Sequence, residues 1–180
     1  MSIVYGVLYA AFLLTQGFIG VRYITTGNKL YFKALLIPNL LFGLYVAAEA
    51  IFDIGVPEII RCFVIIALFI HTFFGYFKDL YTRSKTFDRY LHAYGSFAFA
   101  LFFYTLLSQL MNASVTPKLF GAVLAAFTGI AMGALFEIVE FAIDVKMPVK
   151  TQRGLKDTDM DLIFDVIGSA AAGAAVFFLL

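Results

Sequence analysis

The chain has 180 residues, of which 62% are hydrophobic and only 14% charged, with a mean hydropathy of +0.93 and a formal net charge of +1. This composition excludes a water-soluble globular protein, and the length fits one domain over residues 1–180. The single cysteine, Cys62, excludes an internal disulfide framework.

Six segments are long and apolar enough to cross a bilayer, which takes about 20 residues of helix for a hydrocarbon core of roughly 30 Å. None shows the alternating polarity of barrel strands. The sequence therefore predicts an all-α integral membrane bundle of six transmembrane helices. In chain order they are Ile3–Ile24, Ala34–Phe52, Ile59–Phe77, Leu91–Met111, Leu119–Ala142 and Leu162–Leu180.

The basic residues predict the orientation of these helices. The connections after the first, third and fifth segments hold eleven of the 13 lysines and arginines. Because basic residues collect in cytoplasmic loops, we expect these connections in the cytoplasm and both termini outside, in a multi-pass inner-membrane protein. The two exceptions, Arg61 and Lys118, fall at the opposite ends of their helices.

A weak internal similarity links the second and fifth segments. Three helices followed by three would form two halves of opposite topology, a 3+3 inverted repeat as in many transporters. The alternative is chance combined with common helix-end chemistry, since proline often follows a helix C-terminus. The matching residues, at identical spacing, are Glu49, Asp53 and Pro57, and Glu140, Asp144 and Pro148.

Ionisable residues are costly in lipid, so those inside or at the ends of spans are functional candidates. Here they recur three or four residues apart, which places each set on one face of its helix. Under the predicted orientation all three sets meet at the cytoplasmic ends of consecutive helices. The sets are Asp88 and His92, Glu137 and Glu140, and Asp157, Asp161 and Asp165.

So many carboxylates cannot all be ionised in a small low-dielectric site without compensating positive charge. A divalent cation would supply it, and oxygen ligands with one nitrogen suit Mg²⁺ or Mn²⁺ better than Zn²⁺. The alternative is an interfacial ion-pair network with Arg153 and Arg89, the interpretation we favour for Asp144 and Asp159. We predict metal ligands at Glu137, Glu140, Asp157, Asp161 and Asp165, with His92, oriented by Asp88, as general base or acid.

Three short motifs that contain these ionisable residues resemble the signature of VanZ-like membrane proteins, and most closely that of YjdF-type inner-membrane proteins. They are Asp88-x3-His92, Glu137-x2-Glu140, and the aspartate-rich entry from Asp157 into a glycine-rich last helix. The resemblance covers roughly residues 84–175. It implies a multispanning bacterial or archaeal membrane protein but no particular reaction. Asp165 departs from the pattern, because VanZ-like proteins more often carry asparagine there, whereas six candidate residues match: Asp88, His92, Glu137, Glu140, Asp157 and Asp161.

Three further polar residues stand out in the first half of the chain. A lone histidine within a span, such as His71, is more often a hydrogen-bonded core residue than a ligand; the alternative is that it joins the site. Glu49 and Arg61 fall near the outer ends of adjacent helices, where a neutralising structural pair is favoured over an outer gate.

Three functions fit these observations. The first is a divalent-metal-dependent hydrolase or transferase that acts on a lipid head group or a lipid-linked small molecule at the cytoplasmic face. The second is a small cation-coupled or proton-coupled transporter, and the third is a non-catalytic lipid-binding or scaffold protein. Membrane lipids are the expected partners; nucleic acid is not, because the basic residues are spread over three short loops that fit lipid phosphates. The sequence leaves the oligomeric state open.

Overall fold

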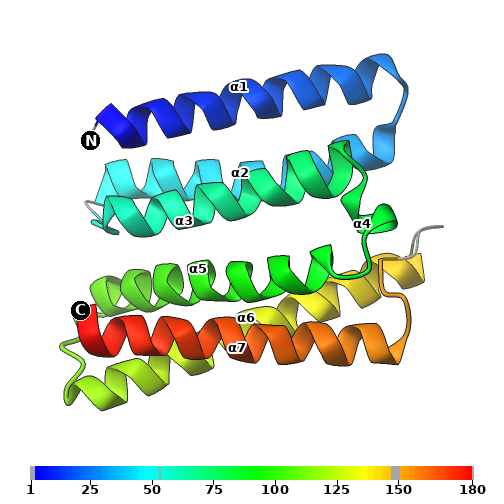
Figure 1. Ribbon diagram of the computed structural model, residues 1–180. Coiled ribbons are helices and arrows are strands. Elements are labelled where there is room, and N and C mark those ends of the chain that lie inside the picture. The colour runs from blue at the N-terminus through cyan, green and yellow to red at the C-terminus, as the bar shows by residue number, and fades with distance from the viewer. Residues whose placement is uncertain (1–2, 53, 147–150, 180) are drawn as a thin grey trace. The chain divides into compact units, whose positions relative to one another are not determined.

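The computed structural model describes residues 3–52, 54–146 and 151–179, and it divides the chain into two compact units, Met1–Lys85 and Thr86–Leu180 (Figure 1). The described residues form helices and turns and contain no strand. The prediction of an all-α chain is therefore confirmed. The division after Lys85 falls between the third and fourth predicted spans.

The first unit contains three long helical segments. They are α1 (Ile3–Thr25), α2 (Lys29–Phe52) and α3 (Glu58–Phe69), which continues as a π-helix, η1 (Ile70–Phe77), before the short α4 (Leu80–Arg83). Gly27 turns the chain between α1 and α2 with a φ of +71°, a conformation that glycine adopts without steric cost. The core of this first unit contains aromatic and aliphatic side chains around Ile19, Tyr23 and Leu35.

Polar side chains link the helices of this first unit. The Gln16 amide donates to the Thr72 hydroxyl at 2.7 Å, and the Asn39 amide donates to the Gln16 carbonyl at 3.1 Å. Arg61 pairs with Glu49 at 2.8 Å, which is the structural pair that the sequence predicted. Such interhelical hydrogen bonds stabilise bundles in lipid.

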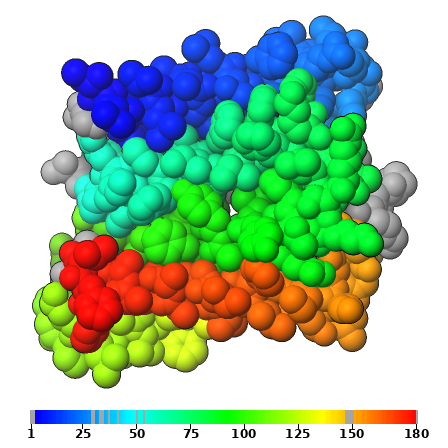
Figure 2. All heavy atoms as spheres, viewed as in Figure 1, coloured from blue at the N-terminus to red at the C-terminus, as the bar shows by residue number. Residues whose placement is uncertain are grey.

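The second unit is a bundle of α5 (Phe87–Leu110), α6 (Lys118–Lys146) and α7 (Leu155–Leu179), in which every helix contacts the other two. The space-filling view shows the atoms of α7, in orange and red, against those of α5 and α6 (Figure 2). Small residues allow this close approach. A Cβ on Gly168 would meet the carbonyl oxygen of Ala93, and a Cβ on Gly133 would meet the carboxyl group of Asp165.

Among the described residues, five helices are long and apolar enough to span a membrane: α1, Glu58–Phe77, α5, α6 and α7. The second predicted span, Ala34–Phe52, coincides with α2, a helix of 24 residues that is not among these five. Five of the six predicted spans are thus supported. The inverted repeat is unconfirmed, and Asp53 and Pro148 of its motif lie outside the described residues.

Three helix starts lie four or more residues before the predicted ones, and the first is α2, which begins at Lys29 instead of Ala34. α5 begins at Phe87, before the predicted Leu91, and α7 begins at Leu155, before the predicted Leu162. The apolar run marks where a helix enters the hydrocarbon core, but a helix can extend beyond it into the interfacial region. As a consequence Asp88, Asp157 and Asp161 lie on rigid helices.

Candidate functional site

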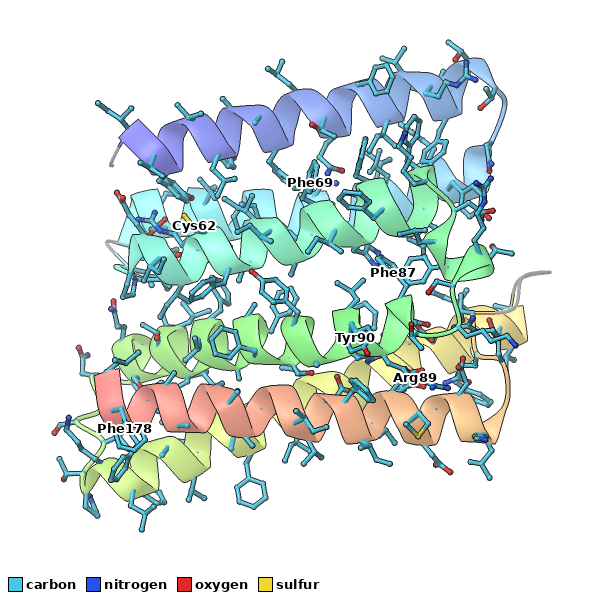
Figure 3. The ribbon with its side chains drawn as sticks, in the orientation of Figure 1. Cys62, Phe69, Phe87, Arg89, Tyr90 and Phe178 are labelled. Carbon is cyan, nitrogen blue, oxygen red and sulfur yellow. The ribbon has the colours of Figure 1, made fainter. Side chains whose placement is uncertain are left out.

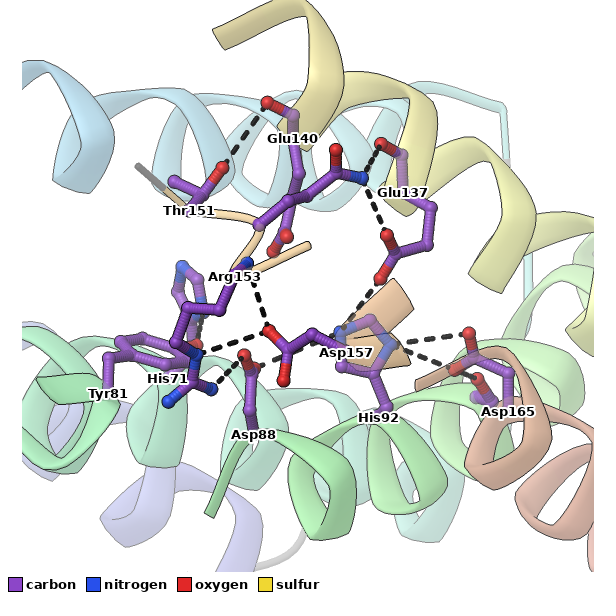
Figure 4. A network of polar contacts seen from close by, with 12 residues as sticks. His71, Tyr81, Asp88, His92, Glu137, Glu140, Thr151, Arg153, Asp157 and Asp165 are labelled. Atoms are coloured by element: carbon purple, nitrogen blue, oxygen red, sulfur yellow. Dashed lines mark hydrogen bonds and ion pairs between the residues drawn. The ribbon is translucent and has the colours of Figure 1, made fainter. Parts of the chain in front are cut away.

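The buried ionisable side chains of the second unit collect in one network near the start of α5 and α7 (Figure 4). In Figure 3, Arg89 and Tyr90 lie toward this end of the bundle, and Phe178 lies at the other. Each of the three helices contributes to the network. The contributing residues are Asp88, His92 and Ser96 from α5, Glu137 and Glu140 from α6, and Asp157, Asp161 and Asp165 from α7.

One ring nitrogen of His92 is held by Asp165. Its Nδ1 lies 3.2 Å from both carboxylate oxygens of Asp165, and the Ser96 hydroxyl donates to the same carboxylate. Asp165 is only 1% exposed and fits because Gly133 faces it without a side chain. The sequence predicted Asp88 as the residue that orients His92, and this is wrong: Asp88 lies 3.9 Å from Nε2, beyond hydrogen-bond distance.

The other ring nitrogen faces a group of carboxylates. Nε2 lies 3.7 Å from Oε1 of Glu137, and ligand atoms of His92, Glu137 and Asp161 all lie within 4.8 Å of one another. The three side chains are buried, at 8%, 5% and 2% exposed. Within the described part of the chain, Glu137 Oε1 and Asp161 Oδ1 have no hydrogen-bond partner. Buried polar atoms are normally paired, so this group is equipped to hold a cation.

A second group of carboxylates shares Asp161 with the first. Ligand atoms of Asp88, Asp157 and Asp161 also lie within 4.8 Å of one another. The Arg153 guanidinium contacts two of them, Asp157 at 3.1 Å and Asp88 at 3.4 Å. Arg153 therefore forms ion pairs with this group, as the ion-pair alternative in the sequence analysis predicted.

The loop before α7 positions Glu137. The Gln152 amide donates to Glu137 Oε2 at 2.7 Å and to the Glu137 carbonyl at 3.0 Å. Asp144 in turn accepts hydrogen bonds from the backbone N–H groups of Thr151 and Gln152, at 2.6 Å and 3.1 Å. Asp144 thus holds the backbone of this loop in place. Gln152 was missed by the sequence analysis because an uncharged amide in a loop gives no periodic signal.

Two predicted metal ligands fall outside both groups. Asp165 is occupied by His92 and Ser96. Glu140 points into the network in Figure 4, but among the described residues it joins neither group that could hold an ion. His71 lies in the first unit, where its Nδ1 is 2.5 Å from the Tyr81 hydroxyl.

An open groove of about 590 Å³ runs beside Glu137, between the end of α6 and the start of α7. Its walls include Ile138, Phe141 and Leu155, which are largely exposed and apolar. Glu137 and Gln152 also line this groove. One of the candidate cation ligands, Glu137, therefore lies beside an apolar surface.

Comparison with known proteins places the chain in a family. Residues 2–180 match the family model described as "Predicted membrane protein (DUF2238)". The chain belongs to the DUF2238 family. An uncharacterised protein of Thermotoga maritima is 37% identical over 124 residues, which are 68% of this chain and 64% of that relative. The chain thus matches somewhat less than two thirds of the length of this relative, and no solved structure matches.

These comparisons correct the family predicted from sequence. VanZ-like proteins form a different family, so that assignment is wrong. YjdF-type proteins are themselves members of the DUF2238 family. The short motifs used for the assignment, such as Asp-x3-His at Asp88 and His92, are therefore not sufficient to separate the two families.

Proposed function

We propose that this DUF2238 protein binds a divalent cation through His92, Glu137 and Asp161, and uses it as a hydrolase or transferase acting on a lipid head group. The observation that carries the proposal is the geometry of the group formed by His92, Glu137 and Asp161. Its three ligand atoms lie within 4.8 Å of one another, and two of its carboxylate oxygens, both on buried residues, have no hydrogen-bond partner among the described residues. A cation would satisfy both oxygens and offset their charge.

The surroundings of His92 support a ligand role for its ring. Metal-binding histidines usually donate their other N–H to a carboxylate, which fixes the tautomer and the ring orientation. Asp165, itself held by Ser96, is placed to accept that N–H from Nδ1, and this leaves the Nε2 lone pair toward Glu137. His92 is then a ligand and not the general base that the sequence predicted. One nitrogen with carboxylate oxygens favours Mn²⁺ or Mg²⁺ over Zn²⁺.

The groove supports a lipid as the substrate. Apolar residues on the outside of a membrane-spanning helix contact lipid, and Ile138 and Phe141 of α6 are 60% and 61% exposed. A lipid whose acyl chain lies on this surface would bring its head group to Glu137 and Gln152. The bound cation would polarise an oxygen of that head group as a Lewis acid.

The packing beyond the network favours this proposal over the transporter. Past Asp165 the next residue on the same face of α7 is Ser169, which is fully buried. A Cβ on Gly129 would meet Ser169 and Ala100, so α5, α6 and α7 are in direct contact there. A transported ion needs a polar path across the membrane, and this contact closes the path along α7.

Metal analysis of purified protein tests the proposal. After incubation with Mn²⁺ and removal of free ion, we expect at least one bound divalent cation per chain. Glu137→Gln should lower the affinity of the protein for Mn²⁺ at least ~10-fold, since a charged ligand is lost. Asp159→Asn is the matched control, because Asp159 is exposed on α7 and lies outside both groups. Wild-type protein that binds no Mn²⁺, Mg²⁺ or Zn²⁺ would refute the proposal and favour the scaffold.

The proposed topology has six spans, in which α2 crosses the membrane together with the five helices named above, and the proposed cation site faces the cytoplasm. In a Cys62→Ser background, cysteines replacing Arg83 or Lys156 should react only with reagents that cross the membrane. A cysteine replacing Ser114, between α5 and α6, should react with an impermeant reagent, and a reporter after Leu180 should behave as extracytoplasmic. The reverse labelling pattern would move the site to the outer face.

A further inference from the structure

We infer that the second unit holds two divalent cations bridged by Asp161, and that the Arg153 side chain occupies the second position until a cation displaces it. The second position is the group formed by Asp88, Asp157 and Asp161. This inference rests on the proposed cation site at His92, Glu137 and Asp161 and extends it to a dinuclear centre.

The charge of the network calls for more than one divalent cation. Six carboxylates gather there, and within the described residues Arg153 is the arginine or lysine that forms ion pairs with them. One divalent cation together with Arg153 leaves a net excess of negative charge among buried groups, which is costly in a low dielectric. A second divalent cation in place of Arg153 reduces that excess further, because it brings two positive charges where the guanidinium brings one. The six are Asp88, Glu137, Glu140, Asp157, Asp161 and Asp165.

Asp161 has the geometry of a bridging ligand. It is the one residue common to both groups, it is only 2% exposed, and its Oδ1 has no hydrogen-bond partner within the described residues. Arg153 satisfies Asp88 and Asp157, yet this Asp161 oxygen stays unpaired. A metal ion at the second position would contact all three carboxylates at once, as oxygen-coordinated cations do.

Arg153 is suited to give way. Its side chain is 37% exposed, whereas those of its partners Asp88 and Asp157 are 7% and 12% exposed. The partly exposed guanidinium can turn into water, and an incoming cation would then compensate the buried carboxylates of Asp88 and Asp157, which would otherwise be left without a counter-charge. Arg153 thus marks a position that a cation can take over.

A dinuclear centre narrows the substrate class. Two cations a few ångströms apart stabilise both the attacking and the leaving oxygen of an in-line displacement at phosphorus. The proposed lipid head group would therefore carry a phosphate ester. Water or a second hydroxyl would attack phosphorus, the ester oxygen would leave and take up a proton, and no oxidant or reductant is needed.

Titration of the full-length protein in detergent with Mn²⁺ tests the inference, followed by metal content and by electron paramagnetic resonance. Wild-type protein should bind two Mn²⁺ per chain and give an exchange-coupled spectrum. Asp157→Asn should bind one Mn²⁺ with an uncoupled spectrum. Arg153→Gln should raise affinity for the second equivalent roughly 10-fold, because the competing cation is gone. Asp159→Asn, at an exposed position of α7 outside both groups, should behave as wild type.

The outcomes separate the two proposals. One Mn²⁺ per chain in both wild type and Arg153→Gln, abolished by Glu137→Gln, would overturn the dinuclear centre and leave the proposed function standing. No Mn²⁺ in any variant would overturn both. If Asp157→Asn fails to elute as a folded species, Asp88→Asn removes a different ligand of the same position and carries the same expectation.

Discussion

Asp161→Asn is expected to cause the largest loss of metal binding of any single substitution in this chain, because Asp161 belongs to both groups that could hold an ion. Asparagine keeps the shape but not the charge, and it is a weak ligand for hard cations. A ligand at 100 times its Kd stabilises the folded state by about 2.7 kcal/mol. Wild-type melting temperature should therefore fall on chelation, and that of Asp161→Asn should not respond.

The fold should survive this substitution, since one fewer carboxylate also relieves repulsion among the others. Asp159→Asn is the matched control, because Asp159 is exposed on the same stretch of α7 and lies outside both groups. Melting temperatures of the three proteins with and without EDTA decide the case. A wild type that is insensitive to EDTA, together with a destabilised Asp161→Asn, would make the network an ion-pair cluster and end the enzyme proposal.

The sequence carried enough information to place the ionisable residues on shared helix faces. Side chains four apart on an α-helix lie one above the other, and the periodicity of Asp157, Asp161 and Asp165 gives one face of α7 directly. The cost of burying charge in lipid then indicates that such faces point toward each other. Helix periodicity and the cost of burying charge in lipid are therefore sufficient to predict which faces carry the network.

The pairing inside the network could not be predicted in the same way. Whether His92 meets Asp88 on its own helix or Asp165 on α7 depends on the rotation of α5 against α7. That rotation is set by Gly133 and Gly168, whose missing side chains admit Asp165 and the Ala93 carbonyl. Ser96 does carry a sequence signal, since it continues the spacing of Asp88 and His92 by another four residues.

Gly168→Ala is expected to be the most destabilising conservative change in the second unit. The added Cβ would collide with the carbonyl oxygen of Ala93, a backbone atom that cannot turn aside as a side chain can. Overpacking of this kind costs typically 1–3 kcal/mol, and α7 would have to move away from α5. Because Asp165 and Asp161 are on α7, the shift should also loosen the His92 contact and weaken Mn²⁺ binding.

The matched control for this change is Gly95→Ala on α5, where a Cβ would meet nothing within 4 Å. Alanine in a helix interior is favoured over glycine by roughly 0.5–1 kcal/mol, so Gly95→Ala should be neutral or stabilising. Thermal melts in detergent with and without Mn²⁺ give both the stability and the metal effect for each variant. If Gly168→Ala melts like wild type, α5 and α7 do not approach at this position, and the placement of Asp165 against His92 fails with it.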